Sequence, residues 1–183
     1  MEKPELDMLI SLCLKDDKRA FRSIVEQFQS MVYSLAYRIL QNREEAEDIV
    51  QETFIRVWVH LEKFDREKNF KTWLYKIASN LCLDKLKLSS RSYRHESFGE
   101  SFDYLVSPED ADRELMEGEM AGILAVLTGH LTPKQKIVFT LRCLDQLEIS
   151  EIVEITGLSP SKIKSNLFLA RRSMRDKLEN YGK

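Results

Sequence analysis

The stretch EISEIVEITGLSPSKIKSNLFLARRSMRDKL, residues 148–178, predicts two helices separated by a tight turn. Gly157 ends the first helix, because glycine tolerates the positive φ angle at which many helices stop. Ser159 is a good N-cap for the second helix, and Pro160 suits its first turn, where a missing N–H costs nothing. Spacings of three and four residues predict one buried side on the second helix, made of Ile163, Leu167, Ala170, Met174 and Leu178.

The remainder of this second helix is strongly basic. Against one acid, Asp176, it carries the cations Lys162, Lys164, Arg171, Arg172, Arg175 and Lys177. A short helix, a glycine turn and a basic second helix are typical of a helix-turn-helix whose second helix reads DNA. A solvated charged surface on an ordinary helical protein is the alternative interpretation of the same pattern.

The composition of the whole chain indicates an all-helical, cytoplasmic protein. In 183 residues there are only six glycines and four prolines, and 43% of the residues are apolar, so helices with real cores are expected. The net charge of −2 gives no general attraction to nucleic acid, and any DNA affinity must come from local patches. No apolar run is long enough to cross a bilayer, and the acidic N-terminus does not resemble a signal peptide.

No residue pattern indicates an enzyme, a metal site or a cofactor. Cys13, Cys82 and Cys143 are odd in number, far apart and embedded in apolar helical patterns, so we expect buried free thiols. The spacings CxxC and HExxH, the EF-hand loop and the glycine-rich phosphate loop do not occur. We therefore expect no catalytic residues, no metal and no cofactor. An all-helical enzyme would need titratable groups that meet in space without a motif.

Residues 5–41 predict three helical pieces that act as a scaffold for the next helices of the chain. The helix after them starts at Asn42, where Asn42 and Glu45 form a capping-box pattern. One side of this helix is apolar, and the other mixes acids with Ile55 and Val59. Exposed apolar residues among acids are typical of a protein-binding surface, whereas packing against the first helices explains Ile55 and Val59 equally well. Both interpretations stay open on the sequence alone.

A second basic helix is predicted from Thr72 to about Arg91, after a polar loop at residues 64–71. Its expected core side runs from Trp73 to Leu88, and lysines occupy much of the remainder. Aromatic side chains beside cations can stack on unpaired bases. For Trp73 a place in the core is the better interpretation.

The sequence changes character at residues 92–112, which hold six acids and one arginine without helical periodicity. This stretch predicts a flexible acidic linker. The expected fold class is therefore all-α, with one domain at residues 1–91, the linker at 92–112, and a helix-turn-helix domain at 113–183. Within the second domain, Thr132 and Pro133 predict the cap and first turn of a further helix.

Three segments resemble bacterial RNA polymerase sigma factors of the sigma-70 family. They are DIVQETFIRVW (48–58), NFKTWLYKIASNLCLDKLK (69–87) and the C-terminal stretch that begins LTPKQK at residue 131. More narrowly, the chain resembles the small extracytoplasmic-function (ECF) group, which keeps only the second and fourth conserved sigma regions. The resemblance covers nearly the whole chain except the linker.

The resemblance implies roles for individual residues. The family grips the β′ clamp of the polymerase through one helix surface, which matches Asp48, Gln51, Glu52 and Ile55. The loop at residues 65–71 matches the loop that captures a base flipped from the −10 promoter element. Positions that contact promoter DNA in the two domains match Lys71, Asn80, Lys85, Lys87, Ser161, Lys162, Lys164, Ser165, Asn166, Arg171 and Arg172.

The resemblance also implies partners: core RNA polymerase through its β′ clamp and β flap, promoter DNA, and an anti-sigma factor, with no membrane insertion. Asn166 departs from the family, in which many relatives carry arginine, and asparagine prefers adenine edges. Lys85 and Lys87 likewise stand where relatives have paired arginines. The alternative hypothesis is a stand-alone helix-turn-helix regulator, which would bind a palindrome as a dimer without polymerase.

Overall fold

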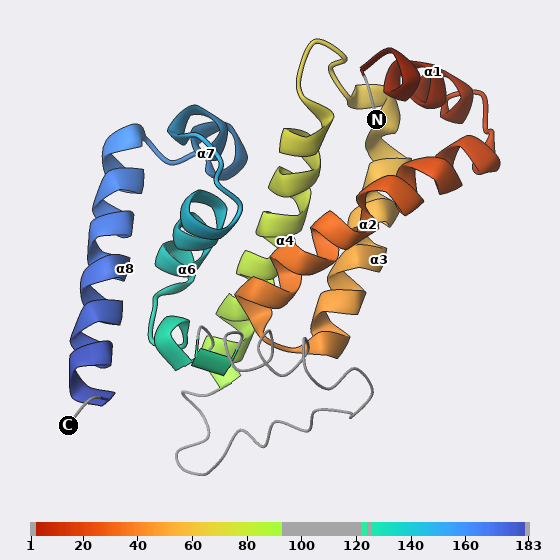
Figure 1. Ribbon diagram of the computed structural model, residues 1–183. Helices are drawn as coiled ribbons and strands as arrows, with labels where there is room; N and C mark the ends of the chain where they lie inside the picture. The colour runs from red at the N-terminus through yellow and green to blue at the C-terminus, as the bar shows by residue number, and fades with distance from the viewer. Residues whose placement is uncertain (1–2, 93–121, 124–125, 182–183) are drawn as a thin grey trace, which may run out of the picture.

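The computed structural model describes residues 3–92, 122–123 and 126–181, and every regular element within these ranges is a helix. The expected all-α class is therefore confirmed. Of the linker expected at residues 92–112, only Ser92 is described, and it ends a helix. The sequence also predicts a helix that begins at Ser107-Pro108, and most of it lies outside the described residues. The described helices form two domains, one before and one after residues 93–121 (Figure 1).

The N-terminal domain consists of α1 (Lys3–Cys13), α2 (Lys18–Leu40), α3 (Arg43–His60), a 3₁₀ turn (Leu61–Lys63) and α4 (Phe70–Ser92). Asn42 caps α3 as predicted, since its Oδ1 accepts the N–H of Glu45 at 2.9 Å, but the described contacts do not include the return bond from the Glu45 carboxylate that would complete a capping box. Asp17 caps α2 by accepting the N–H groups of Arg19 and Ala20. Helices α2 and α3 pack along each other, and α4 packs against both.

The prediction of three helical pieces in residues 5–41 is wrong, because α2 continues without a break to Leu40. The polar pair Gln29-Ser30 separates two apolar runs in the sequence. Buried residues nevertheless keep their helical spacing across this pair, from Phe28 to Val32. Packing on one continuous side therefore holds the helix together where the local sequence is polar.

The C-terminal domain contains the predicted helix-turn-helix, made of α7 (Ile149–Thr156) and α8 (Pro160–Tyr181). They follow α6 (Pro133–Phe139) and a π-helical turn, η2 (Thr140–Leu144). Gly157 ends α7 with a φ of 68°, and Ser159 Oγ accepts the N–H of Lys162. Thr132 and Pro133 give the cap and first turn of α6 as expected, and Thr132 forms a capping box with Gln135.

Several expectations about burial are wrong. Leu88 is 64% exposed and Leu178 is 54% exposed, because the core contacts of α4 and α8 stop several residues before each helix ends. Cys143 is only half-buried, whereas Cys13 and Cys82 are buried as expected.

Helix α4 also begins at Phe70 rather than Thr72. The reason is a cap, since Asn69 Oδ1 accepts the N–H groups of Lys71 and Thr72.

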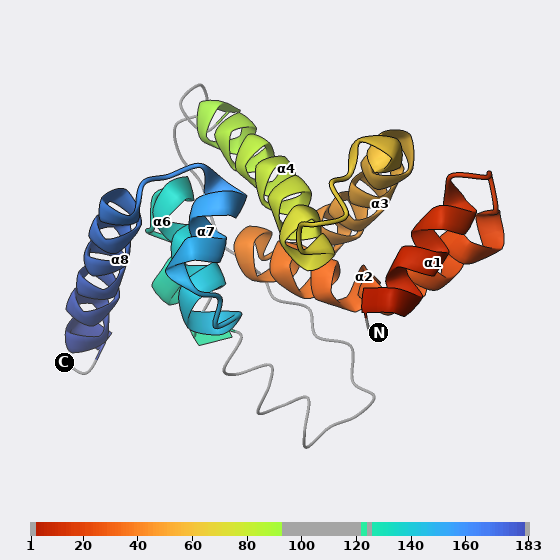
Figure 2. The same cartoon turned by 90° about the horizontal axis from the view of Figure 1, so that it is seen from above.

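The two domains pack against each other through α4, which lies beside α6 and α7 (Figures 1 and 2). One contiguous apolar core joins them and includes Leu74 of α4 together with Leu141 and Ile152 of the C-terminal domain. In both views α8 lies on the far side of α6 and α7 from α4. No described helix is long and apolar enough to cross a membrane.

Candidate functional site

The acidic side of α3 is open to solvent. Asp48, Gln51 and Ile55 are exposed and Glu52 is half-buried. Ile55 and Val59 are each 58% exposed, so packing against the first helices does not explain them and that alternative is wrong. This side of α3 therefore combines carboxylates with uncovered apolar side chains, the composition of a protein-binding surface.

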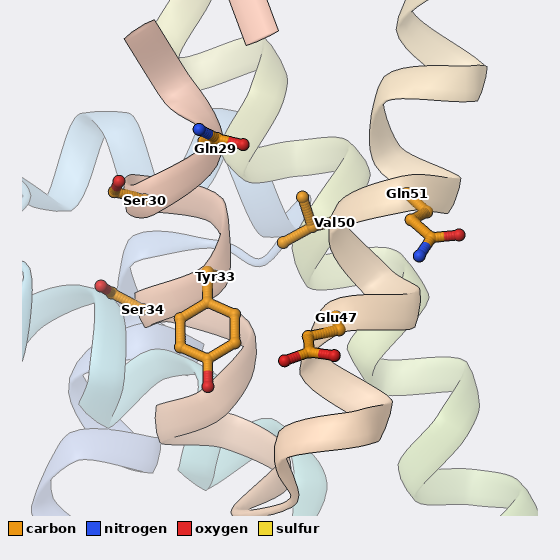
Figure 3. Close-up of a pocket in the computed structure, with 7 residues that line it drawn as sticks. All are labelled: Gln29, Ser30, Tyr33, Ser34, Glu47, Val50 and Gln51. Atoms are coloured by element: carbon orange, nitrogen blue, oxygen red, sulfur yellow. The ribbon is translucent and has the colours of Figure 1, made fainter. Parts of the chain in front are cut away.

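A groove of about 490 Å³ runs between α2 and α3 beside this surface (Figure 3). Most of its lining residues are polar, and they comprise Gln29, Ser30, Tyr33, Ser34, Glu47, Val50 and Gln51. Tyr33 stacks on Tyr37 with ring centroids 6.0 Å apart and an interplanar angle of 7°. Gln51 links the groove to the exposed acidic side of α3, and the two form one continuous candidate surface.

An aromatic cluster fixes the loop between α3 and α4. The ring centroids of Phe64, Phe70 and Trp73 lie 4.9–5.6 Å apart. Phe70 is buried and Trp73 is half-buried, so these rings pack on one another, as expected for Trp73. Arg66 Nη1 donates to Ser11 Oγ at 2.9 Å and ties the tip of the loop to α1.

On α4 the candidate DNA-contacting residues divide between two sides. Asn80 and Lys87 are exposed and share one stripe, seven residues apart. Lys85 turns toward α3, where its Nζ lies 3.6 Å from Asp48 Oδ2, and Lys87 Nζ lies 3.0 Å from Asp84 Oδ1. Exposed ion pairs contribute at most about 1 kcal/mol, so phosphates can replace these carboxylates at little cost.

On α8 the predicted reading residues occupy the first turns. The exposed ones are Ser161, Lys162, Lys164 and Ser165. Asn166 is half-buried, and its Nδ2 donates to the carbonyl of Lys162 at 2.7 Å, so this amide folds back onto its own helix. Across the described residues Lys162 and Lys164 form no ion pair, which leaves both charges available to phosphates.

Arg171 and Arg172 lie further along α8 and are exposed. Arg172 Nε lies 4.0 Å from Asp176 Oδ2, and a guanidinium nitrogen of Arg171 lies 3.6 Å from the sulfur of Cys143. Neither contact is strong, so both arginines can turn to phosphates.

The sequence did not indicate a role for Arg142, which stabilises the segment that leads into the helix-turn-helix. Its Nη1 donates to the carbonyl of Leu147 at 2.8 Å and lies 3.2 Å from Glu148 Oε1. Glu148 in turn forms a capping box with Glu151 at the start of α7. No sequence signal marks Arg142, because the contact depends on the π-helical turn that precedes α7.

Buried titratable groups lie away from these surfaces. Burial raises the pKa of the Cys13 thiol and raises that of Cys82 to about 12, so both stay protonated and unreactive at neutral pH. Burial also lowers the pKa of Lys136 to about 8. In the part of the chain that the structure describes, no group of three or more His, Cys, Asp or Glu side chains is placed to hold a metal ion.

Comparison with known proteins agrees with this arrangement. The family Sigma-70 region 2 matches residues 24–92, and the family Sigma-70, region 4 matches residues 122–174. The chain is 33% identical over 176 residues to the ECF RNA polymerase sigma factor SigW of Bacillus subtilis, covering 91% of this chain and 92% of SigW. It is 30% identical to the ECF RNA polymerase sigma-E factor of Haemophilus influenzae, covering 93% and 94% of the two chains.

Solved structures share the fold. CnrH in complex with the cytosolic domain of CnrY matches with a TM-score of 0.67 at 20% identity, covering 94% of this chain and 96% of that one. The sigma factor RpoE in complex with the anti-sigma factor NepR, from Bartonella quintana, matches with the same TM-score at 19% identity, covering 87% and 96%.

Regions 2 and 4, in this order and on two helical domains, define a sigma factor of the sigma-70 class. The chain belongs to the extracytoplasmic-function group of RNA polymerase sigma factors, because two members of that group align with it over nine-tenths of its length. It is a factor that directs RNA polymerase to promoters, and the stand-alone regulator is not favoured.

Proposed function

We propose that the chain binds core RNA polymerase through the exposed side of α3, with Asp48, Gln51, Glu52 and Ile55 against the β′ clamp. The observation that carries this assignment is the exposure of Ile55 and Val59 among carboxylates. Apolar side chains left uncovered at the middle of a charged surface gain free energy when a protein partner covers them. The acids around them supply orientation and a fast approach to a basic partner.

The two basic helices then contact promoter DNA. Helix α8 enters the major groove of the −35 element with Ser161, Lys162, Lys164, Ser165 and Asn166, while Arg171 and Arg172 hold phosphates. This role is supported by the exposed first turns of α8 and by its Lys162 and Lys164, which form no ion pair within the part of the chain that the structure describes.

Helix α4 and the loop before it contact the −10 element, with Asn80 at a base edge and Lys71, Lys85 and Lys87 at phosphates. The loop at residues 65–71 holds a base flipped out of the duplex. Binding that base offsets the free energy of unstacking, which is a few kcal/mol per base.

Each domain alone offers few phosphate contacts, so free DNA affinity is weak and falls steeply with salt. On the polymerase the two domains act as linked modules with a high effective concentration. We assign residues 1–91 to region 2, 92–112 to the linker and 113–183 to region 4. The factor itself carries out no chemistry, which remains with the polymerase, and it acts in the cytoplasm where that enzyme is found.

Two further partners use exposed surfaces of the same helices. The exposed side chains of Phe168 and Leu169 on α8 offer an apolar patch to the β flap. An anti-sigma factor, of the kind bound to the similar RpoE structure, would inhibit the chain by covering the α3 surface.

A gel-shift assay with and without core polymerase tests the proposal against the stand-alone regulator. The sigma factor requires core polymerase before it shifts promoter DNA at physiological salt. A shift of a palindromic fragment by the chain alone, with the stoichiometry of a dimer, would support the regulator instead.

A further inference from the structure

The loop at residues 65–71 forms a compact turn above the aromatic cluster. Lys68 N–H donates to the carbonyl of Asp65 at 3.0 Å, and Glu67 N–H donates to Asp65 Oδ1 at 3.1 Å. A carboxylate that accepts an N–H two residues further along is a common way to stabilise a turn. Arg66 is therefore one of the two residues at the tip of this turn, and it is exposed.

The side chain of Arg66 leaves the loop and contacts α1. Its Nη1 donates to Ser11 Oγ at 2.9 Å, across 55 positions of sequence, and Figure 1 shows the loop beside α1. Ser11 Oγ itself donates to the carbonyl of Asp7 at 2.7 Å. Because that donation fixes the direction of the hydroxyl hydrogen, a lone pair of Oγ remains for the guanidinium, and the two hydrogen bonds strengthen each other.

Ser11 is a well-fixed anchor, because Ile10 and Cys13 beside it on α1 are buried in the core that α1 shares with α2. Ser11 also lies in the last turn of α1, which holds no basic residue of its own. A cation is stabilised near a helix C-terminus, where the helix dipole is negative. Arg66 supplies this charge from another part of the chain, so a hydrogen bond and the helix dipole favour the same position of its side chain.

The contact affects how the loop receives a base. A loop that moves freely loses conformational entropy when it binds, whereas a loop already held in its binding geometry loses little. Asn80 and Lys87, the other candidate contacts to the −10 element, lie on α4, which packs against α2 and α3. Loss of the contact with α1 should therefore change only the binding of the base that the loop holds.

We propose that Ser11 is a positioning residue for promoter recognition, which acts through Arg66 to hold the loop at residues 65–71 in the geometry that accepts the flipped base. Helix α1 thereby contributes to the choice of that base without itself contacting DNA. This inference rests on the proposed function and assigns to it a residue outside the DNA-contacting segments.

Three variants isolate the hydroxyl of Ser11. Ser11→Ala removes the group that accepts from Arg66, and Ser11→Thr restores a hydroxyl that can make the same two hydrogen bonds. The matched control is Ser23→Ala on α2. Ser23 Oγ also donates to a carbonyl four residues back, that of Arg19 at 3.4 Å, and its described contact stays within its own helix.

Amide hydrogen exchange on the full-length chain, without polymerase, tests the contact by itself. The amides of Glu67 and Lys68 are hydrogen-bonded inside the turn, so their exchange reports how often the loop opens. We expect Ser11→Ala to exchange them about fivefold faster, the size expected for one hydrogen bond. Ser11→Thr and Ser23→Ala should match wild type. Exchange in Ser11→Ala at the wild-type rate would overturn the inference, because the contact would then not hold the loop.

Promoter binding by the holoenzyme tests the consequence for recognition. The probe is a promoter found by mapping start sites, single-stranded across the −10 element and randomised at one −10 position at a time, and the bound molecules are sequenced. We expect Ser11→Ala to lower base preference about fivefold at one position, and Ser11→Thr to restore it. A loss spread evenly over all positions, or no loss at any position, would overturn the inference.

The variant Arg66→Gln, alone and combined with Ser11→Ala, assigns the effect to this pair. If Ser11 acts only through Arg66, the double variant loses no more base preference than Arg66→Gln alone. Additive losses would contradict the proposal. A uniform loss of affinity in Arg66→Gln with none in Ser11→Ala would also contradict it, since Arg66 would then be a phosphate contact.

A wild-type holoenzyme with no base preference at any −10 position would refute the proposed function, and with it the role of Ser11 in recognition. Faster exchange of the loop amides in Ser11→Ala would then still be measurable in the free chain. The failure of the proposed function and the failure of the contact are therefore distinguishable.

Discussion

Lys85 Nζ lies 3.6 Å from Asp48 Oδ2, and this ion pair connects the surface assigned to the polymerase with the helix assigned to the −10 element. Both side chains are substantially exposed, so the pair itself adds little stability. If polymerase engages Asp48 as proposed, the Lys85 side chain is released toward DNA. Because both proposed contacts would break this ion pair, we expect polymerase binding at Asp48 and DNA binding at Lys85 to favour each other.

The double variant Asp48→Lys and Glu52→Lys should abolish binding to core polymerase without unfolding the chain, because both acids lie at the surface. Like charges across an interface cost several kcal/mol, or more than about a hundredfold in affinity. The control is Glu154→Lys with Glu179→Lys, which makes the same charge change on exposed residues of the C-terminal domain. Co-purification of the first variant with core polymerase at normal yield would refute the assignment of this surface.

Lys164→Ala should lower promoter binding by the holoenzyme on all sequences and reduce the salt dependence by about one phosphate contact. Lys134→Ala is the control, since it removes another lysine from the surface of the same domain. Binding measured across a salt series distinguishes them. If binding falls with salt concentration at the same slope for Lys164→Ala and wild type, Lys164 does not contact a phosphate.

Asn166→Ala should instead alter base preference. In the free chain its amide bonds to the carbonyl of Lys162, so reading a base requires this contact to be exchanged. Loss of the amide should cost about 1–3 kcal/mol at one base pair, with little change at others. Selection from a library of −35 variants measures this, and an unchanged sequence preference would show that Asn166 does not face a base.

Gly157→Ala should lower the free energy of unfolding by about 1 kcal/mol. The residue has a φ of 68°, and an added Cβ would meet no atom within 4 Å, so backbone strain is the whole effect. Gly157→Asn is the matched comparison and should lose less, because asparagine tolerates this conformation better. Urea denaturation measures the free energy of unfolding of both variants. Equal losses for Gly157→Ala and Gly157→Asn would contradict backbone strain as the cause.

Burial of Lys136 makes the free energy of unfolding of the chain rise with pH. Burial lowers its folded pKa from 10.5 to about 8, so between these values the unfolded chain binds more protons and stability rises with pH. The benefit is complete above the unfolded pKa and disappears as pH falls through about 8. Lys136→Met should remove this rise and stabilise the chain at neutral pH by on the order of 2 kcal/mol. A rise that persists in urea titrations of the variant would assign it to another group.

Local signals in the sequence predict much of this structure. They succeed for features, such as caps and turns, that depend only on residues close by in the sequence. Asn42, Thr132, Gly157 and Ser159 act through neighbours within four residues, and all four take the predicted roles. The exposure of Ile55 was not decided in this way, because the composition of its helix face fitted packing against the first helices equally well, and only the structure excludes that alternative.

Features that depend on distant residues could not be predicted in this way. The continuity of α2 past Gln29 depends on α3 and α4, and the exposure of Leu88 and Leu178 depends on where partner helices end. The pairing of Arg38 with Asp145 joins residues 107 positions apart, and nothing in either local sequence marks it. The arrangement of the domains therefore required the structure.

In vitro transcription on a genomic DNA library, with purified core polymerase and with start sites mapped, tests the central claim most directly. With the factor present we expect new start sites that share a two-part motif centred near −10 and −35, and none of these with core polymerase alone. An unchanged set of start sites, together with specific DNA binding by the chain in the absence of polymerase, would contradict the assignment of this chain as a sigma factor.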